Sequence, residues 1–515
     1  MRRFFFFQLL CWCVAALQLN AQAKPNVVFI FIDDLRPDLG CYGNAVVKSP
    51  HLDQLAGKGA LFTNEYATVP TCGASRFGLL TGRYPAEKAA LGNEAAEKII
   101  SGKPQGASPE TFIEQFRRNG YHTVGIGKIS HSADGYLYGY TEPRSNKPEL
   151  PNSWDEMLFN AGKWQTGWNA FFGYADGSNR QGKKGQVKPY EAGDCDDDGY
   201  PDGLTANLAT EKIRTLAQSN QPFFLGIGFF KPHLPFTAPR RYWDLYDEAS
   251  IPLTPSPNIP EGVNPASLHQ SGEFNQYKSG DEAASLSTPL SDNYARKLRH
   301  AYYAAISYVD AQVGKVLEAI RKNGLDKNTI IVVWGDHGWH LGDDRVWGKH
   351  TVFEWSLRSA FIVKTPGSNN GVVRNEIVSA ADIYPTLMEL CGLKMPYRGD
   401  GESLAKLLQQ SPVPSWRNTA ISYFNKGISI RTPRYRYTQY FREATPVIEL
   451  YDHLSDPREN KNSAAENPKI VAEMQQRWQK EIENARKIYK ARQRNNGTDT
   501  QKAMGNTTRL VKQLS

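Results

Sequence analysis

The chain has 515 residues, of which 40% are hydrophobic, and its formal net charge is +8 at pH 7. A chain of this length buries most of the surface that it exposes when unfolded, and we expect more than one domain. Six cysteines are far too few for a small disulfide-stapled scaffold, so the core must come from apolar burial. The modest positive charge fits an anionic partner or none, and we expect no nucleic-acid partner.

Residues 1–23 have the three-part layout of a secretory signal peptide. Two arginines precede an apolar run from Phe4 to about Leu17, and small residues end the segment. This run is too short for a comfortable membrane span, and no second apolar run of about 20 residues follows. We therefore expect a soluble protein with no membrane span, exported to the periplasm or the extracellular space. Four cysteines would remain, enough for two disulfide bonds at most: Cys41, Cys72, Cys195 and Cys391.

Four runs of β-branched and aromatic residues predict strands that are buried on both faces of a parallel sheet. Helix-like segments precede three of these runs. The alternation favours an α/β fold with a mostly parallel central sheet flanked by helices. The strand-like runs are 26–34, 121–128, 222–229 and 328–337, and the helix-like segments are 111–119, 205–218 and 294–322.

Polar residues lie at or just past the carboxyl ends of these predicted strands. Open α/β sheets bind ligands at that edge. A single such residue would often only cap the next helix, but four strands with the same feature favour a functional site. The residues are Asp33, Asp34, Lys128, His233, Asp336 and His337.

The pattern of the sequence changes near residue 396. Short strand-like stretches at 419–424, 428–432 and 435–441 precede a basic helix-like segment at 468–494. We expect a main catalytic domain over 24–395 and a smaller α+β subdomain over 396–494. The polar composition of 495–515 predicts a loose tail.

The stretch DCDDDGYPD, from Asp194 to Asp202, has the Asp-x-Asp-x-Asp-Gly spacing of a calcium loop. Thr205 stands where such a loop needs a bidentate glutamate, and no helix is predicted before the loop. We therefore favour an acidic surface loop. Its carboxylates would raise the pKa of Cys195 and leave that thiol unreactive.

A short motif begins at Cys72. The sequence CGASR, from Cys72 to Arg76, matches the sulfatase pattern Cys-x-(Pro or Ala)-Ser-Arg, and LTGR at 80–83 completes it. Further motifs occur in similar order: DDLRPDLGCYGN, GKISH, KPHLPF, GDHGWHLGDD, WGKH and ELYDHLSDPRENKN. Over most of residues 25–465 the chain resembles the formylglycine-dependent sulfatases of the alkaline phosphatase superfamily, most closely the iduronate-2-sulfatase-like branch. The resemblance implies an alkaline-phosphatase-like fold.

The resemblance also implies a chemical change at Cys72. In that family a formylglycine-generating maturation enzyme oxidises the cysteine to an aldehyde. The hydrated aldehyde has two hydroxyls on one carbon, so that one attacks sulfur and the other then collapses to expel sulfate. The alternative for a lone cysteine is an inert buried thiol.

A single divalent cation belongs to the implied site. Its oxygen-rich ligand set suits calcium better than zinc. The implied ligands are Asp33, Asp34, modified Cys72, Asp336 and His337.

The resemblance assigns further catalytic roles. Arg76, Lys128 and Lys349 would hold the aldehyde hydrate and the sulfate, and their charge would stabilise the reacting anion. His131 would deprotonate the second hydroxyl, and His233 would protonate the departing sugar oxygen.

A sulfated uronic acid or a similar sulfated sugar is the implied substrate. Trp339 would form a wall of the pocket, and His340 is either a substrate contact or a satisfied polar residue. The lysine that the family uses for the uronate carboxylate falls at Phe424, with Lys426 displaced by two positions. This departure argues against iduronate itself and leaves open another sulfated polysaccharide, such as an algal glycan.

Two other functions remain open. A phosphodiesterase or phosphonate hydrolase of the same superfamily would share the fold, but most such enzymes use serine or threonine as the nucleophile and a second metal site. A non-catalytic protein that binds sulfated glycans would keep Cys72 as a thiol.

Overall fold

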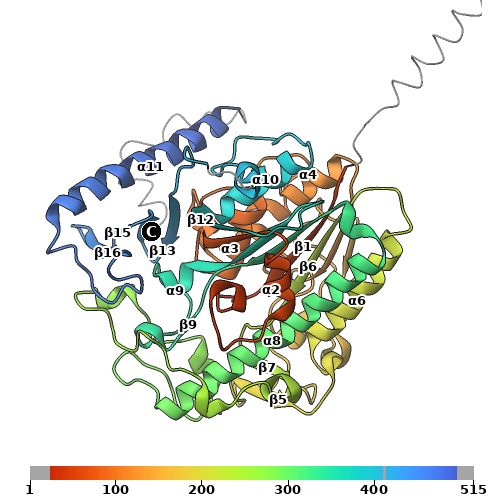
Figure 1. Cartoon of the computed structure of the whole chain (residues 1–515), viewed down its shortest axis with the longest axis horizontal. Coiled ribbons are helices and arrows are strands. Elements are labelled where there is room, and N and C mark those ends of the chain that lie inside the picture. The colour runs from red at the N-terminus through yellow and green to blue at the C-terminus, as the bar shows by residue number, and fades with distance from the viewer. Residues whose placement is uncertain (1–23, 410–412, 496–515) are drawn as a thin grey trace, which may run out of the picture.

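The computed structural model describes residues 24–409 and 413–495 (Figure 1). The predicted signal peptide lies outside the described residues, and so does nearly all of the predicted tail. Within the described ranges no helix is long and apolar enough to cross a membrane. Cys41, Cys72, Cys195 and Cys391 are all free thiols.

An eight-stranded sheet forms the centre of the molecule, with the strand order β12-β2-β11-β8-β1-β6-β3-β4. Only the pairings of β11 are antiparallel, so the predicted mostly parallel α/β sheet is confirmed. The strands are β1 (Asn26–Ile32), β2 (Ala60–Tyr66), β3 (His122–Gly127), β4 (Glu156–Leu158), β6 (Phe223–Phe229), β8 (Thr329–Gly335), β11 (Arg358–Lys364) and β12 (Val372–Ser379).

Strand β1 explains why helices cover both faces of the sheet. All seven of its residues are buried, and alternate side chains enter opposite cores. The core that contains Ile30 is closed by α2 (Pro50–Ala56), α6 (Pro201–Leu216) and α8 (Asp292–Lys322). The core that contains Phe29 is closed by α3 (Cys72–Thr81), α4 (Phe112–Arg118) and α10 (Ile383–Leu390) (Figure 1). The three predicted helices correspond to α4, α6 and α8.

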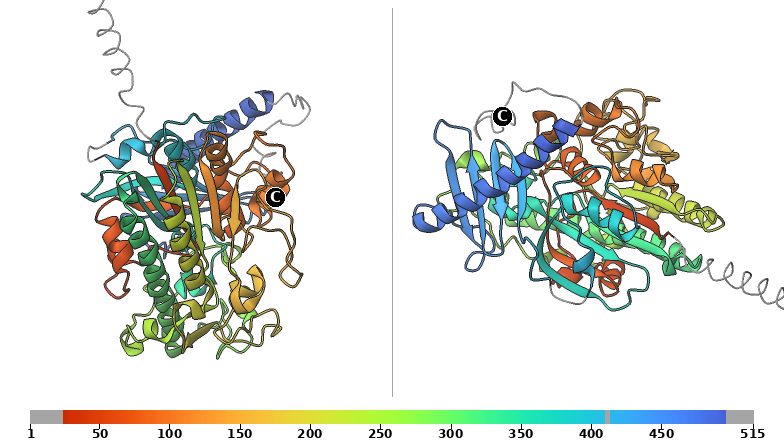
Figure 2. Two further views of the ribbon diagram at one scale, coloured as in Figure 1. Left: turned by 90° about the vertical axis from the view of Figure 1, so that its right-hand side faces the viewer. Right: turned by 90° about the horizontal axis from the view of Figure 1, so that it is seen from above.

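A smaller C-terminal domain lies beside the central sheet (Figure 2). Its antiparallel sheet contains β13 (Ala420–Phe424), β14 (Gly427–Arg431), β15 (Tyr435–Tyr440) and β16 (Val447–Asp452). Helix α11 (Pro468–Asn495) packs on this sheet, where Trp478 Nε1 donates a hydrogen bond to the carbonyl oxygen of Ile428 (3.0 Å). The predicted strands and helix are confirmed, and β16 was not predicted.

Short elements fill the connections. Two small sheets pair β5 (Tyr190–Gly193) with β7 (Phe236–Pro239) and β9 (His340–Leu341) with β10 (Trp347–Gly348). The short helices are α5 (Gly167–Phe171), α7 (Arg240–Trp243) and α9 (Glu354–Leu357).

Candidate active site

The predicted site residues meet at the carboxyl edge of the central sheet. Strand β1 runs parallel to both β6 and β8, and β3 runs parallel to β6, so their carboxyl ends lie together. Helix α3 begins at this edge with Cys72. The residues that the strand ends supply are Asp33 and Asp34 after β1, Lys128 after β3, His233 after β6, and Asp336 and His337 after β8.

Cys72 is enclosed by charged groups, and only 3% of its surface is exposed. Its Sγ lies 3.3 Å from Lys349 Nζ and 3.4 Å from His337 Nε2. Burial, followed by the charge of Asp33, raises the pKa of the thiol to about 12. A thiol with this pKa stays protonated at neutral pH and is a poor nucleophile. The unmodified side chain is therefore badly suited to attack an ester.

Arg76 lies one helical turn after Cys72 and joins three strand ends. Its fully buried guanidinium contacts Asp33 Oδ1 through Nη2 (3.0 Å) and Asp336 Oδ2 through Nε (3.0 Å). Its Nη1 donates a hydrogen bond to the carbonyl oxygen of Lys128 (2.6 Å). The planar guanidinium offers donors in several fixed directions, which an ammonium group does not. Arg76 therefore holds the ends of β1, β3 and β8 in place.

Asp33 is held in its ionised form. Lys128 Nζ lies 2.6 Å from Asp33 Oδ2. Burial alone would raise the pKa of Asp33, but the charges of Lys128 and Arg76 outweigh it and hold that pKa well below the usual range.

Side chains around Asp34 provide donors for a divalent cation. Asp34 Oδ1 lies 3.5 Å from His337 Nε2, and Asp336 Oδ1 lies 3.8 Å from the same nitrogen. His337 Nδ1 donates to the carbonyl oxygen of Gly338 (2.9 Å), so Nε2 can present a lone pair to a metal. Carboxylate oxygens predominate, which favours calcium or magnesium over zinc. The donors form two groups that share Cys72: Asp33, Asp34, Cys72 and His233 make one, and Cys72, Asp336 and His337 make the other.

The backbone of Asp34 is strained, and its buried negative charge is only partly compensated by a nearby cation. Burial raises its pKa well above the usual range, although Lys349 Nζ, 2.9 Å from Oδ1, opposes this. Its φ of 57° lies in the left-handed region, which costs a residue other than glycine about 1 kcal/mol or more. Backbone strain of this kind is typical of functional sites. A divalent cation would favour the ionised form of this carboxylate.

Glu273 belongs to the site although it was not predicted. Its Oε1 lies 3.0 Å from His233 Nε2 and 3.4 Å from Lys349 Nζ. Burial, followed by Lys349, lowers the pKa of His233, and Glu273 opposes the shift. Because His233 Nδ1 donates to the carbonyl oxygen of Leu234 (2.6 Å), the contact between Nε2 and Oε1 requires a second proton. We infer that this pair retains a proton in spite of its burial.

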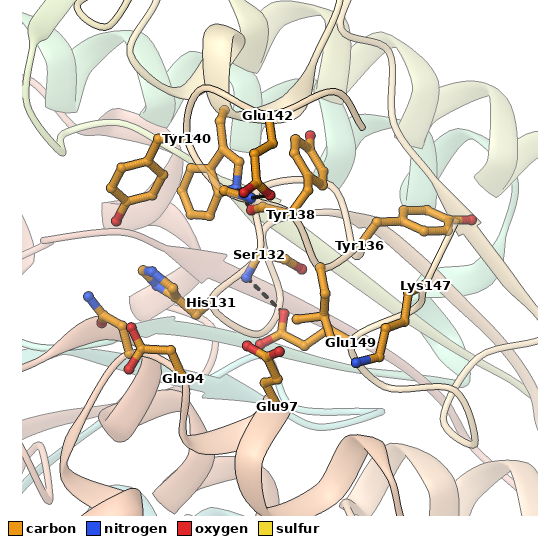
Figure 3. Close-up of a pocket in the computed structure, with 14 residues that line it drawn as sticks. Glu94, Glu97, His131, Ser132, Tyr136, Tyr138, Tyr140, Glu142, Lys147 and Glu149 are labelled. Carbon is orange, nitrogen blue, oxygen red and sulfur yellow. Dashed lines mark hydrogen bonds between the residues drawn. The ribbon is translucent and has the colours of Figure 1, made fainter. Parts of the chain in front are cut away.

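His131 lies at the edge of the site and lines a pocket of about 480 Å³ (Figure 3). Its ring centroid is 5.3 Å from that of Trp168. Burial, followed by the charge of Lys128, lowers the pKa of His131 well below the usual range. The imidazole is therefore neutral near pH 7, as a general base must be.

The substrate contacts of Trp339 and His340 stay predictions. Both side chains are fully buried, as are Lys128 and His337 of the proposed reaction centre. His340 Nδ1 contacts the carbonyl oxygen of Asp343 (3.1 Å), and its Nε2 contacts Thr351 Oγ1 (2.9 Å). Since the protein satisfies both ring nitrogens, His340 fits the alternative of a buried polar residue. The centroid of the Trp339 ring lies 5.2 Å from Lys349 Nζ, so the ring packs against that side chain.

Phe424 stands at the position where the resemblance implied a lysine for the uronate carboxylate. Phe424 stacks on His350, with ring centroids 5.4 Å apart. Lys426 lies in the exposed turn between β13 and β14. Phe424 therefore offers no charge to a uronate carboxylate.

The stretch from Asp194 to Asp202 is only partly the predicted surface loop, because Asp194 is exposed whereas Asp197 and Asp202 are buried. Asp194 pairs with Arg240, and Asp197 pairs with Lys315 (2.7 Å). Asp202 accepts hydrogen bonds from two backbone amides (2.8 Å each). Because protein groups already compensate these carboxylates, the loop is not arranged to hold a second calcium ion.

The fold and the charged strand ends define an α/β protein with a buried centre of the kind that hydrolytic enzymes use. A family model described as Sulfatase matches residues 25–393. A second model, described as N-sulphoglucosamine sulphohydrolase, C-terminal, matches residues 335–487. The chain belongs to the sulfatase family and is a sulfuric ester hydrolase.

Individual proteins agree with this assignment. A sulfatase of Formosa agariphila is 31% identical over 456 residues, which cover 86% of this chain and 83% of that protein. Iduronate 2-sulfatase of Mus musculus is 28% identical over 485 residues, which cover 80% and 84%. The resemblance seen in the sequence motifs is thereby confirmed.

Solved structures show the same fold. A phosphonate monoester hydrolase of Agrobacterium radiobacter superposes with a TM-score of 0.70 at 24% identity, covering 90% of this chain and 96% of that one. A 2-O GAG sulfatase gives a TM-score of 0.65 at 21% identity, covering 91% and 94%.

Proposed function

We propose that the protein removes sulfate from a sulfated sugar, with Cys72 converted to formylglycine and one calcium ion bound beside it. The observation that carries this proposal is the position of Cys72, buried within 3.4 Å of both Lys349 and His337. The names of relatives support the substrate class. They include iduronate 2-sulfatase and an ulvan-active sulfatase of Formosa agariphila that is 27% identical over 86% of this chain.

The proposed modification would replace the poorly nucleophilic thiol of Cys72. Because its pKa is raised to about 12, Cys72 as encoded would supply little thiolate at neutral pH. The aldehyde hydrate supplies an oxygen nucleophile and a second hydroxyl for the release of sulfate. The proposed partner for this step is a formylglycine-generating maturation enzyme.

The proposed cation site consists of oxygen donors with one imidazole. Bound calcium would lower the pKa of the attacking hydroxyl and attract a sulfate oxygen. Its proposed ligands are Asp33, Asp34, modified Cys72, Asp336 and His337, whose donor atoms lie close together.

The remaining side chains bind the anion and move protons. Lys128 and Lys349 would hold sulfate oxygens, and Arg76 would fix the strand ends that carry the donors. Neutral His131 would accept the proton of the second hydroxyl. His233 would give the proton that it shares with Glu273 to the departing sugar oxygen.

The proposal also covers processing and domain organisation. Residues 1–23 would be removed as a signal peptide on export to the periplasm or the extracellular space. We propose 24–395 as the catalytic domain, 396–494 as the C-terminal subdomain and 495–515 as the tail.

A phosphonate or phosphodiester hydrolase is the second candidate, because a phosphonate monoester hydrolase shares the fold with a TM-score of 0.70. Release of the same alcohol from a matched sulfate ester, phosphonate monoester and phosphodiester separates the two. We expect a higher kcat/KM for the sulfate ester. Equal or faster hydrolysis of either phosphorus ester would overturn the proposal, and binding of sulfated glycans without any hydrolysis would favour a non-catalytic protein.

A further inference from the structure

A pocket of about 480 Å³ opens next to the proposed reaction centre (Figure 3). His131 lines the pocket, and the charges of Lys128 and Lys349 act on its ring. Asn93 also lines it, and Asn93 Oδ1 accepts a hydrogen bond from the backbone amide of Gly73 (3.1 Å), the residue after Cys72. The pocket therefore begins where helix α3 begins, and a sugar whose sulfate reached Cys72 would enter it.

The lining of this pocket is acidic. Four carboxylates line it, whereas Lys147 is the one lysine or arginine among the described residues that do so. The reaction centre differs, because its carboxylates are paired with cations: Arg76 and Lys128 contact Asp33, and Lys349 contacts Asp34. A sulfate ester would thus meet cations at its sulfate and carboxylates at its sugar. The four acidic residues of the lining are Glu94, Glu97, Glu142 and Glu149.

Glu149 is the most deeply placed of these carboxylates, with an exposed fraction of 2%. Its Oε2 accepts hydrogen bonds from Ser130 Oγ (2.6 Å) and from the backbone amide of Ser132 (2.8 Å). Both donors are uncharged, so they do not cancel the formal charge of Glu149. The same bonds hold the loop that carries His131. Glu149 therefore places a carboxylate beside the loop of His131, at the inner end of the pocket.

Aromatic side chains form the opposite wall. Tyr136, Tyr138 and Tyr140 face the helical turn of Glu94 and Glu97 across the pocket (Figure 3). Tyr140 is 42% exposed, and its ring packs edge-on against Trp168 with centroids 4.6 Å apart. Exposed, well-supported aromatic rings are suited to the apolar faces of pyranoses.

We propose that this pocket binds the sugar ring that bears the reactive sulfate, and that it selects a neutral, hydroxyl-rich pyranose over a uronate. The inference rests on the proposed function of the adjoining centre. Sugar hydroxyls can donate hydrogen bonds to the carboxylates of the pocket. A uronate carboxylate or a second sulfate would instead be repelled, most strongly near buried Glu149, because like charges brought together are costly.

The test compares pairs of sulfated pyranosides that differ only in carrying a hydroxymethyl or a carboxylate group at C5. Pairs with the sulfate at C2 and at C3 would both be assayed, together with nitrophenyl sulfate, which lacks a sugar. We expect kcat/KM for the neutral member to exceed that of the uronate by about tenfold or more. Equal or faster hydrolysis of the uronate would overturn the inference.

Variants separate the charge of the pocket from its shape. Glu149→Gln keeps the size of the side chain and should reduce the preference for the neutral sugar. Glu97→Lys reverses a charge at an exposed position, so it should reduce the preference even if the buried variant folds poorly. Glu211→Gln, on the exposed face of α6, is the matched control and should leave the ratio unchanged. An unchanged ratio in both pocket variants would overturn the inference.

The outcomes distinguish the pocket from the reaction centre. If nitrophenyl sulfate is hydrolysed and the neutral and uronate sugars are hydrolysed equally well, only the proposed selectivity of the pocket is overturned. No hydrolysis of any sulfate ester would overturn the proposed function and this inference with it.

Discussion

Glu273 Oε1 lies 3.0 Å from His233 Nε2, a hydrogen-bond distance when that nitrogen carries a proton. The other ring nitrogen of His233 already donates its hydrogen to a backbone carbonyl oxygen. Lys349 lies 3.4 Å from the same carboxylate oxygen and favours the ionised form of Glu273. This pair can therefore store the proton that a departing sugar oxygen needs.

Replacement of Glu273 by glutamine should separate good from poor leaving groups. The new amide can donate to neutral His233, so the packing is retained while the shared proton is lost. We expect kcat for a sugar sulfate to fall by about 10²-fold, and kcat for nitrophenyl sulfate to fall much less. The alkaline limb of the pH profile for the sugar ester should move to lower pH. His233→Ala should give the same pattern, and equal losses on both esters would show that the pair is not the acid.

Removal of Arg76 should destabilise the fold. Arg76→Ala would leave Asp33 and Asp336 buried without their shared cation, which costs about 3–5 kcal/mol of unfolding free energy. Arg76→Lys should recover only part of this, because an ammonium does not reproduce the divergent donors of the guanidinium. Denaturant unfolding would measure both variants. Arg241 provides the control, because its side chain is half exposed and its buried partner Asp197 keeps a second ion pair with Lys315, so Arg241→Ala should cost less than about 1 kcal/mol.

Calcium should stabilise the folded protein through the donors around Asp34. A ligand that binds only the native state at 100 times its Kd adds about 2.7 kcal/mol. We therefore expect the Tm to fall after chelation and to recover with calcium. Asp34→Asn should weaken this response, whereas Asp194→Asn, in the acidic surface loop, should leave it intact. A Tm that does not respond to calcium would contradict the proposed site.

Glu65 should make stability depend on pH. This residue of β2 is fully buried, and burial raises its pKa from 4.5 to about 8, although Ser359 and Trp334 donate hydrogen bonds to it. The native state therefore keeps a proton that the unfolded state loses above pH 4.5. Its stabilising contribution is complete below that pH and is lost as the pH rises towards 8, at about 1.4 kcal/mol per unit.

The variant Glu65→Gln removes this titration. The difference in unfolding free energy between pH 5 and pH 8 should shrink by up to about 4 kcal/mol, as measured by denaturant unfolding at both pH values. An unchanged difference would mean that Glu65 is ionised in the native state.

Four of the eight strands of the sheet were predictable because nearly all of their residues are buried, whereas β2, β4, β11 and β12 were not predicted. The continuous apolar runs that end at Asp34, Lys128, Phe229 and His337 correspond to β1, β3, β6 and β8. Parallel strands bring their carboxyl ends to one edge, so the meeting of the polar residues that follow them was predictable as well. The antiparallel direction of β11 was not, since it depends on pairing with strands far away in the sequence.

The sequence did not predict the site residues that lie in irregular segments. Glu273 lies in a long connection without periodicity, and only the folded chain brings it to His233. The acidic pocket combines 93–97 with 131–149, whose carboxylates look like ordinary surface residues in the sequence. For His340 the sequence left two alternatives open, because its place in a motif did not reveal that the protein contacts both of its ring nitrogens.

The most direct test of the account is the chemical state of residue 72 in protein produced by a host that can mature sulfatases. Mass spectrometry of the tryptic peptide that ends at Arg76 should show an aldehyde, lighter than the encoded thiol. Cys72→Ala should lose turnover while its Tm stays close to that of the parent, because a small buried residue replaces another. An active protein whose peptide carries only the unmodified thiol would contradict the account.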